Sequence, residues 1–218
     1  MKIETITLGS LETNCFIVWD EQTKKCVVID PGTYEEKLMN FIEHNKLLVT
    51  HIAITHGHID HVGGVKELCE KLMNHQKKPQ VVMSKLEKTM MEELAQVKYQ
   101  KLFFDLDIDV KNGDMLDFGF VSFEAILVPG HTSFSMCFYN SENHIVFVGD
   151  TLFYHSIGTE YYYDGPGTDL SQNIVKYLFT LPETTIVYPG HKNLTDIKEE
   201  KLRNPYLSDA NTVDPWTL

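Results

Sequence analysis

The stretch THGHIDHVGG, residues 55–64, decides the fold of this chain. It follows the β-rich run THIAIT (50–55) and precedes VKELCEKLM (65–73), in which apolar residues recur at helical spacing. The pattern predicts a histidine-rich loop between a strand and a helix. Glycines inside and after the loop permit the close backbone turns that such a connection needs.

Within this loop, His56, His58, Asp60 and His61 form the pattern HxHxDH. The alternation lets His56 and His58 point the same way in extended backbone, so one metal ion can take both. Asp60 and His61 lie where the chain begins to turn into the next helix, so their side chains can face a second ion. The loop therefore predicts ligands for two neighbouring metal ions.

Three later apolar runs also end in a residue that can bind a metal. LVPG precedes His131, VFVG precedes Asp150 and IVYPG precedes His191. Because strand ends can aim side chains from distant parts of a chain at one point, we expect the four ends to build one site. Imidazoles mixed with carboxylates suit zinc, iron or manganese rather than calcium or magnesium. Other histidines lack such a setting and are interpreted as ordinary core or surface residues: His44, His51, His75 and His144.

The charge and the cysteines limit the classes of partner and location. The formal net charge is -12, with 19 Lys and Arg against 31 Asp and Glu, and such a surface repels nucleic acid. The first residues, MKIETITLGS, lack the pattern of a secretory signal, and no apolar run approaches the roughly 20 residues that span a bilayer. We expect no nucleic-acid or membrane partner and a cytoplasmic location with reduced, mostly buried thiols at Cys15, Cys26, Cys69 and Cys137.

The rest of the chain predicts strands mixed with helices. Strand-like runs cover 2–8, 15–19, 25–30, 50–55, 121–128, 135–139, 144–148 and 185–188, and helical patterns cover about 34–45, 65–73, 84–97, 170–180 and 196–203. Thr33 with Glu36, and Ser84 with Glu87, resemble capping boxes, and Asn112-Gly113 predicts a hairpin turn. These elements imply an α/β protein with two sheets between helical layers.

The chain resembles the metallo-β-lactamase superfamily, and within it the short glyoxalase II (hydroxyacylglutathione hydrolase)-like branch. The resemblance rests on VVIDPG (27–32), THGHIDHVGG (55–64), VPGHTSFSMCFY (128–139), VFVGDTLF (146–153), SIG (156–158) and VYPGHKNLTDIKEEKLRNPYL (187–207). It implies a four-layer αββα sandwich of two mixed β-sheets flanked by helices. It also implies that residues 1–218 form a single domain, without the separate C-terminal helical domain that helps longer relatives hold glutathione.

The resemblance also implies a set of metal ligands for two divalent ions, zinc first, with iron or manganese as alternatives. One ion would be bound by His56, His58 and His131, and the other by Asp60, His61 and His191. Asp150 would bridge the two ions. Asp30 matches an aspartate beneath the metal loop in this family, which implies either a supporting role or a plain turn residue of the DPG triplet.

The expected chemistry is hydrolysis of a small thioester or ester substrate. Two ions that share a water lower its pKa to about 7, so a hydroxide nucleophile is available at neutral pH. The predicted catalytic residues are Asp60, as a proton acceptor, and the bridging Asp150. The predicted substrate-binding residues are Thr159, Tyr161 and Lys192; Thr159 follows SIG, where the short relatives usually carry a basic residue.

Three alternatives stay open beside this expectation. One is an iron persulfide dioxygenase with a single ion, and another is a lactonase assisted by a tyrosine, for which the candidates are Tyr154, Tyr161, Tyr162 and Tyr163. β-Lactam hydrolysis is disfavoured because Asp150 stands where a cysteine would be expected and HxHxDH is complete. The non-enzyme alternative is a metal-binding interaction scaffold.

Overall fold

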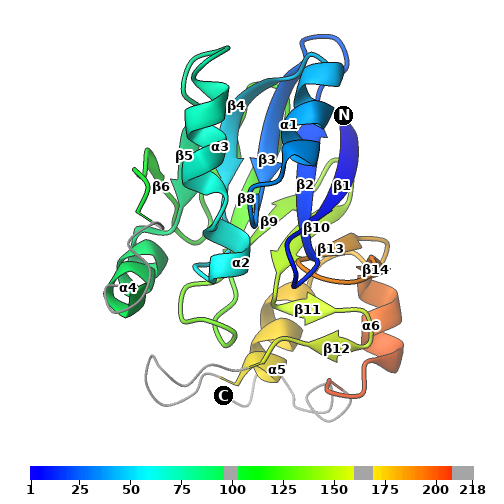
Figure 1. Ribbon diagram of the computed structural model, residues 1–218. Helices are drawn as coiled ribbons and strands as arrows, with labels where there is room; N and C mark the ends of the chain where they lie inside the picture. The colour runs from blue at the N-terminus through cyan, green and yellow to red at the C-terminus, as the bar shows by residue number, and fades with distance from the viewer. Residues whose placement is uncertain (96–102, 160–168, 208–218) are drawn as a thin grey trace. The chain divides into compact units, whose positions relative to one another are not determined.

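The computed structural model describes residues 1–95, 103–159 and 169–207. Its contacts divide the chain into two compact units, the first formed by Met1–Val110 with Leu116–Ser122 and the second by Lys111–Met115 with Phe123–Leu218. The described residues form two six-stranded mixed sheets and a two-stranded one. The strands are labelled in Figure 1. The expected class, two mixed β-sheets with helices, is therefore confirmed.

The sheet of the first unit has the order β1 (Lys2–Leu8), β2 (Thr13–Trp19), β3 (Lys25–Ile29), β4 (Leu48–Ala53), β5 (Gln80–Met83), β6 (Ile108–Asp109). Pairing is antiparallel from β1 to β3 and parallel from β3 to β6. Its helices are α1 (Glu36–His44), α2 (Ile59–Val62), α3 (Val65–Leu72) and α4 (Lys85–Ala95). Because β3, β4 and β5 run in the same direction, the segments that follow them leave from one edge of the sheet.

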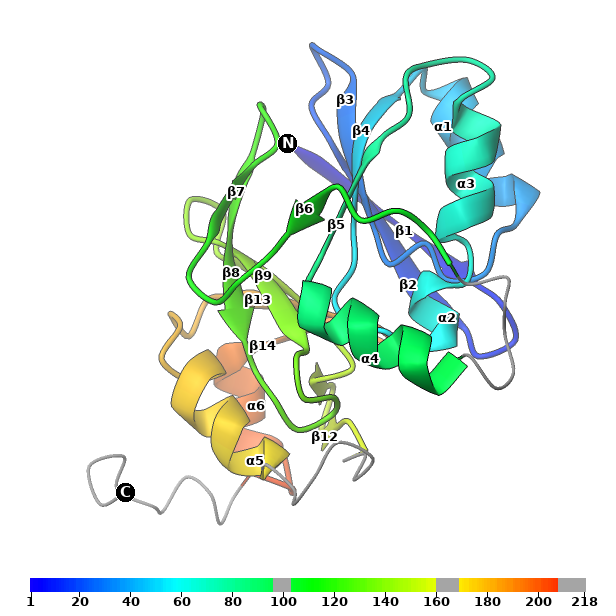
Figure 2. The same ribbon diagram turned by 90° about the vertical axis from the view of Figure 1, so that its left-hand side faces the viewer.

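Helices α1 and α3 lie side by side on one face of this sheet (Figure 2). Leu38 and Ile42 of α1 pack in one buried cluster with Leu68 and Leu72 of α3 and with strand residues such as Ile52. The helical spacing of these apolar side chains is the pattern that predicted both helices. Their burial fixes the edge from which the histidine-rich loop starts.

The second sheet, most of which belongs to the second unit, has the order β14 (Thr195–Asp196), β13 (Ile186–Pro189), β10 (Ile145–Gly149), β9 (Met136–Asn140), β8 (Ser122–Leu127), β7 (Met115–Asp117). A small hairpin, β11 (Leu152–Phe153) with β12 (Ser156–Ile157), follows β10. The helices are α5 (Leu170–Asn173), which continues as the π-helical turn η3 (Ile174–Leu178), and α6 (Ile197–Arg203).

Three strands of the second sheet end at the same edge. Strand β9 is antiparallel to both β8 and β10, and β10 is parallel to β13, so β8, β10 and β13 share one direction. Leu170, Ile174 and Ile197 of the helices pack with Val146 and Val187 of the strands in one buried cluster. This packing holds the segments after β8, β10 and β13, which carry the later predicted ligands.

Two local predictions about helix starts turn out differently. The capping box at Thr33 and Glu36 is wrong, because the N-cap of α1 is Glu35 and its side chain makes no capping bond. Glu35 instead accepts a hydrogen bond from the backbone of Gly9 at 2.6 Å, so a tertiary contact sets this helix start. At the second site Ser84 does accept from the Glu87 N–H at 3.4 Å, whereas the Glu87 carboxylate turns elsewhere.

The hairpin predicted at Asn112-Gly113 is also wrong. Strand β6 pairs with β5, and β7 belongs to the other sheet beside β8, so the turn links two sheets. Gly113 has a φ of 83, as expected of a turn glycine. The Asn112 side chain accepts from the Leu127 backbone at 2.8 Å, which ties the turn to β8.

All four cysteines are buried and free, as expected. Burial raises the pKa of the Cys137 thiol to about 12 and that of the Cys69 thiol to about 11. These thiols are therefore protonated and unreactive at neutral pH. Among the described residues, no helix has the length and apolar character needed to cross a membrane.

Candidate metal centre

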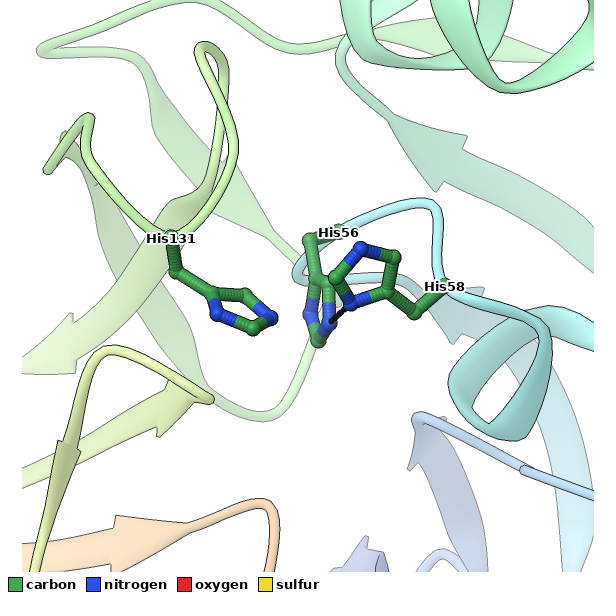
Figure 3. A group of neighbouring side chains, drawn as sticks. All are labelled: His56, His58 and His131. Atoms are coloured by element: carbon green, nitrogen blue, oxygen red, sulfur yellow. Dashed lines mark hydrogen bonds between the residues drawn. The ribbon is translucent and has the colours of Figure 1, made fainter. Parts of the chain in front are cut away.

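The predicted loop between strand and helix is present in the first unit. Strand β4 ends at Ala53, and α2 begins at Ile59 with His58 as its N-cap. His56 Nε2 lies 3.1 Å from His58 Nδ1, and Figure 3 shows these two rings together, with His131 of the second unit as the third ring drawn. The rings of His56 and His61 have their centroids 4.1 Å apart. The HxHxDH pattern therefore gathers its imidazoles, as the alternation predicted.

Asp30 holds this loop from below. Its Oδ1 accepts from the Thr55 N–H at 2.9 Å, and its Oδ2 accepts from the Thr55 hydroxyl at 2.6 Å and contacts His61 Nδ1 at 3.0 Å. A carboxylate only accepts, so the proton of His61 sits on Nδ1 and the Nε2 lone pair is kept for a metal. Asp30 is 1% exposed and adopts a φ of 49. These contacts favour the supporting role over a plain turn residue.

Asp60 lies next to this cluster. Its Oδ2 is 3.6 Å from His61 Nε2 and accepts a hydrogen bond from the Thr13 hydroxyl at 3.3 Å. Backbone of the preceding loop is also close, because a Cβ at Gly32, where φ is 57, would lie 2.8 Å from the Asp60 carbonyl. Asp60 and His61 thus present an oxygen and a nitrogen to the same point.

Glu87 contacts the histidine-rich loop in a way that the sequence pattern did not reveal. Its side chain is 3% exposed, and its Oε1 accepts from the Gly57 N–H at 2.8 Å, between His56 and His58. A Cβ at Gly57 would lie 2.9 Å from Met91 Cβ, so glycine allows this close approach. The only sequence signal was the Ser84 capping pattern, which gave Glu87 a helix-capping task. The structure shows that Glu87 anchors the metal loop.

The second unit gathers its three predicted ligands around one carboxylate oxygen. Asp150 Oδ2 is 3.7 Å from His131 Nε2 and 3.5 Å from His191 Nε2. The Gly190 N–H donates to the Gly149 carbonyl at 2.8 Å, which holds the ends of β10 and β13 together. An oxygen placed between two imidazole nitrogens fits the bridging role expected of Asp150.

His131 is oriented by the main chain of the SIG segment. Its Nδ1 is 2.8 Å from the Thr159 carbonyl, and a carbonyl only accepts, so Nδ1 carries the proton and Nε2 is left to bind metal. A Cβ at Gly158 would lie 1.9 Å from the Asp150 carbonyl and 3.0 Å from His131 Nδ1. Residues 158 and 159 therefore pack directly against two predicted ligands.

The predicted substrate-binding residues fall into two groups. Thr159 and Lys192 have exposed side chains, and Lys192 follows His191 with a φ of 63. Tyr161 lies outside the described residues, as do Tyr162 and Tyr163. Of the tyrosines considered for a lactonase, Tyr154 lies in the described residues and stacks on His155 with ring centroids 4.0 Å apart.

The donor set fits divalent transition metals. In the first unit, His56 and His61 form a buried group with the supporting Asp30, whose nitrogen and oxygen atoms all lie within 4.8 Å of one another. In both units an oxygen acceptor holds the Nδ1 proton of a predicted ligand, at His61 and at His131, so that Nε2 faces a carboxylate oxygen. Nitrogen and oxygen donors in this mixture are typical of zinc, iron and manganese sites.

Residues 8–191 match the metallo-beta-lactamase superfamily, a range that includes every predicted ligand. The chain is also 30% identical over 221 residues to hydroxyacylglutathione hydrolase GloC of Haemophilus influenzae, with 97% of this chain and 100% of that protein covered. The protein therefore belongs to the metallo-β-lactamase superfamily.

Solved structures place it in the same fold. The B3 metallo-beta-lactamase BLEG-1 superposes with a TM-score of 0.81 at 28% identity, covering 95% of this chain and 100% of that chain. TTHA1623 in a di-iron-bound form gives 0.77 at 33% identity, with 94% and 100% covered. ETHE1 from Myxococcus xanthus gives 0.76 at 28% identity, with 96% and 85% covered. The fold is that of the metallo-β-lactamase superfamily.

Proposed function

We propose that this protein is a thioester hydrolase of glyoxalase II type whose predicted ligands hold two divalent ions. The observation that carries the proposal is the matched orientation of the ligand imidazoles. His61 and His131 each donate a hydrogen bond from Nδ1–H to an oxygen acceptor and direct Nε2 toward a carboxylate oxygen. The likeness to GloC of Haemophilus influenzae supports hydrolysis, and the di-iron form of TTHA1623 supports two ions.

The proposed division of labour follows the contacts of each side chain. The bound ions supply a hydroxide nucleophile and polarise the substrate carbonyl. Asp60 is the proton acceptor: its Oδ2 lies 3.6 Å from His61 Nε2 and accepts a hydrogen bond from the Thr13 hydroxyl at 3.3 Å. Asp150 holds the ligands of its unit around one oxygen. Asp30 and the Thr159 carbonyl keep His61 and His131, respectively, in the tautomer that carries its proton on Nδ1 and can bind a metal through Nε2.

The proposed substrate is a small thioester or ester of low negative charge. The side chain at 159 is exposed and uncharged, so it cannot make the charge-assisted contact to a glutathione carboxylate that a basic residue would make. Such a contact contributes on the order of 1.5 to 3 kcal/mol, and its absence costs roughly tenfold to a hundredfold in specificity. The net charge of -12 also supports a small-molecule substrate over nucleic acid, and the buried free thiols support a cytoplasmic location.

The substrate proposal is tested by kcat/KM for S-lactoylglutathione and for uncharged acyl-thiols, in the wild type and in Thr159→Arg. We expect the wild type to prefer the uncharged acyl-thiols and the arginine to raise kcat/KM for the glutathione thioester about tenfold or more. Lys192→Gln is the matched control for the other candidate cation. A wild type that strongly prefers S-lactoylglutathione, with no gain from arginine, contradicts the role given to position 159.

The reaction class is tested by thiol release from several acyl-thiols, run beside oxygen uptake with a persulfide substrate. The second candidate is the iron persulfide dioxygenase, which the likeness to ETHE1 from Myxococcus xanthus favours. Oxygen uptake without thiol release establishes that candidate and contradicts hydrolysis. A β-lactam is included in the same series because of the likeness to BLEG-1, and preferential opening of its ring also contradicts the thioesterase proposal.

A further inference from the structure

Glu200 is a fully buried carboxylate outside the predicted ligand set. It lies on α6 at 0% exposure and accepts hydrogen bonds from three groups. The Thr195 hydroxyl donates to Oε1 at 2.6 Å, the Asn204 side-chain amide donates to Oε2 at 2.7 Å, and the His155 N–H lies 3.1 Å from Oε2. A buried charge is stable only with such a complete set of donors. The network therefore specifies one position for each of its members.

The network holds the turn of the β11–β12 hairpin, which lies beside α6 in Figure 1. His155 adopts a φ of 53, a left-handed conformation that a non-glycine residue keeps only when its surroundings impose it. Glu200 fixes the N–H of His155, and Asn204 donates to the Ser156 carbonyl at 3.1 Å. Two consecutive residues of the hairpin are thus tied to the C-terminal helix.

The same hairpin runs on to the groups that orient His131. Strand β12 ends at Ile157, the next residue is Gly158, which packs against the Asp150 carbonyl, and the Thr159 carbonyl then meets His131 Nδ1 at 2.8 Å. Any displacement of the turn is passed along three or four residues of extended chain to His131. Glu200 is therefore connected to a predicted ligand through the backbone from His155 to Thr159 and one hydrogen bond at each end of it.

The other side of the network reaches the strand before His191. Thr195 belongs to β14 and pairs with Val187 of β13, the strand that precedes His191. Asp196, the next residue, caps α6 by accepting from the Glu199 N–H at 2.7 Å. Helix α6 is thus joined at its N-terminal end, through β14, to β13, the strand that precedes His191. Through Glu200 it is joined to the β11–β12 hairpin.

We infer that Glu200 is a positioning residue that sets the spacing of His131 and His191 for metal binding. This inference rests on the proposed function, because it takes both histidines to be ligands. Through Thr195, Glu200 holds β14 and its neighbour β13, the strand before His191. Through His155 it holds the hairpin that leads to the Thr159 carbonyl and His131. A single buried carboxylate therefore positions the segments that carry or orient both histidines. The role requires a charge that accepts three hydrogen bonds, and glutamine of the same shape supplies only one acceptor oxygen.

The test compares the affinity of the protein for zinc, measured by competition with a chromophoric chelator, in the wild type, Glu200→Gln and Asn204→Ala. Partners that orient metal ligands typically change metal affinity by roughly tenfold to a hundredfold. We expect a loss of about tenfold or more in Glu200→Gln. A smaller loss is expected in Asn204→Ala, which removes the bonds to Glu200 and Ser156 but keeps the Glu200 bonds to Thr195 and His155. In the metal-free protein, nitrogen NMR of the His131 ring should show a reduced Nδ1–H population in both variants.

Three controls make the result decisive. Glu199→Gln changes the neighbouring carboxylate, which contacts His155 Nε2 and Arg203 but not the hairpin backbone, and should keep zinc affinity within about twofold of the wild type. Leu178→Ala removes a buried side chain of the same core and should lower thermal stability without lowering zinc affinity. His131→Ala tests the ligand role itself.

The outcomes separate the two proposals. If His131→Ala binds zinc as the wild type does, the proposed ligand set fails. If His131→Ala loses zinc while Glu200→Gln and Asn204→Ala keep wild-type affinity and the His131 tautomer, the positioning role of Glu200 is overturned. It is also overturned if Leu178→Ala loses as much zinc affinity as Glu200→Gln, since the loss would then reflect general destabilisation.

Discussion

Replacing Asp30 by asparagine reverses one hydrogen bond at the base of the metal loop. The amide NH₂ that replaces Oδ2 cannot accept from the Thr55 hydroxyl at 2.6 Å or from His61 Nδ1 at 3.0 Å. It can only donate to His61 Nδ1, which moves the imidazole proton to Nε2, the atom that must bind the metal. An equivalent wrong-tautomer effect explains the large loss in serine proteases whose orienting aspartate is changed to asparagine.

The expected loss follows from the supporting role of Asp30. Partners that orient metal ligands are worth roughly tenfold to a hundredfold in metal affinity or activity, about 1.4 to 2.7 kcal/mol. Asp30→Asn should lower zinc affinity and kcat/KM for an acyl-thiol by factors in this range while the fold is kept. The measurements are chelator competition and thiol release at saturating zinc.

Asp20 provides a matched control for this substitution. Asp20 also accepts hydrogen bonds from the backbone N–H and the hydroxyl of a threonine, Thr23, at 2.7 and 2.8 Å. Unlike Asp30, it has no hydrogen bond to a histidine of the described residues. Asp20→Asn should therefore leave zinc affinity and kcat/KM unchanged. Wild-type zinc affinity in Asp30→Asn, or an equal loss in Asp20→Asn, refutes the tautomer argument.

Three further predictions follow from the second unit. Gly158→Ala should lower metal content and activity at least tenfold, because its Cβ would lie 1.9 Å from the Asp150 carbonyl; normal metal content in the purified variant contradicts this. Asp150→Ala should abolish hydrolysis and reduce bound metal with the fold intact, whereas His44→Ala should be silent, and activity near wild type in the former removes Asp150 from the mechanism. Asp169 is the N-cap of α5, and the hydrogen bond from Ser171 lowers the pKa of its carboxyl group. The ionised carboxylate therefore stabilises the folded state above the unfolded-state pKa of about 3.9, and this stabilisation is lost as pH falls through the lower folded-state pKa. Urea unfolding of Asp169→Asn should show a stability deficit at pH 6 that shrinks at pH 3, and a constant deficit contradicts the assignment.

The parts of the fold that sequence could predict are those governed by local pattern. Residues 2–8 form β1 as predicted, and the apolar spacing after residue 65 gives α3. The ligand pattern was also readable, because apolar runs precede the HxHxDH loop, His131, Asp150 and His191, and the strand direction decides at which edge of the sheet each run ends. Asp150 after β10 and His191 after β13 illustrate this, since the two strands are parallel neighbours.

The parts that sequence could not predict depend on contacts across the fold. The Thr33 capping box fails because Glu35 is drawn to Gly9, which lies 26 residues earlier in the chain. Glu87 reads as a helix-capping residue until its carboxylate is seen on Gly57. Glu200 carries no sequence signal of its own, because its task is defined by donors from residues 155, 195 and 204.

The proposed site holds two metal ions through the predicted ligands. The most direct measurement is the number of metal ions per chain, by elemental analysis, in protein saturated with zinc, iron or manganese and freed of excess metal. The account predicts a value close to two ions, which falls when Asp150 is changed to alanine. Saturation at one ion in a fully loaded, folded preparation would contradict it and would favour the mononuclear iron enzyme.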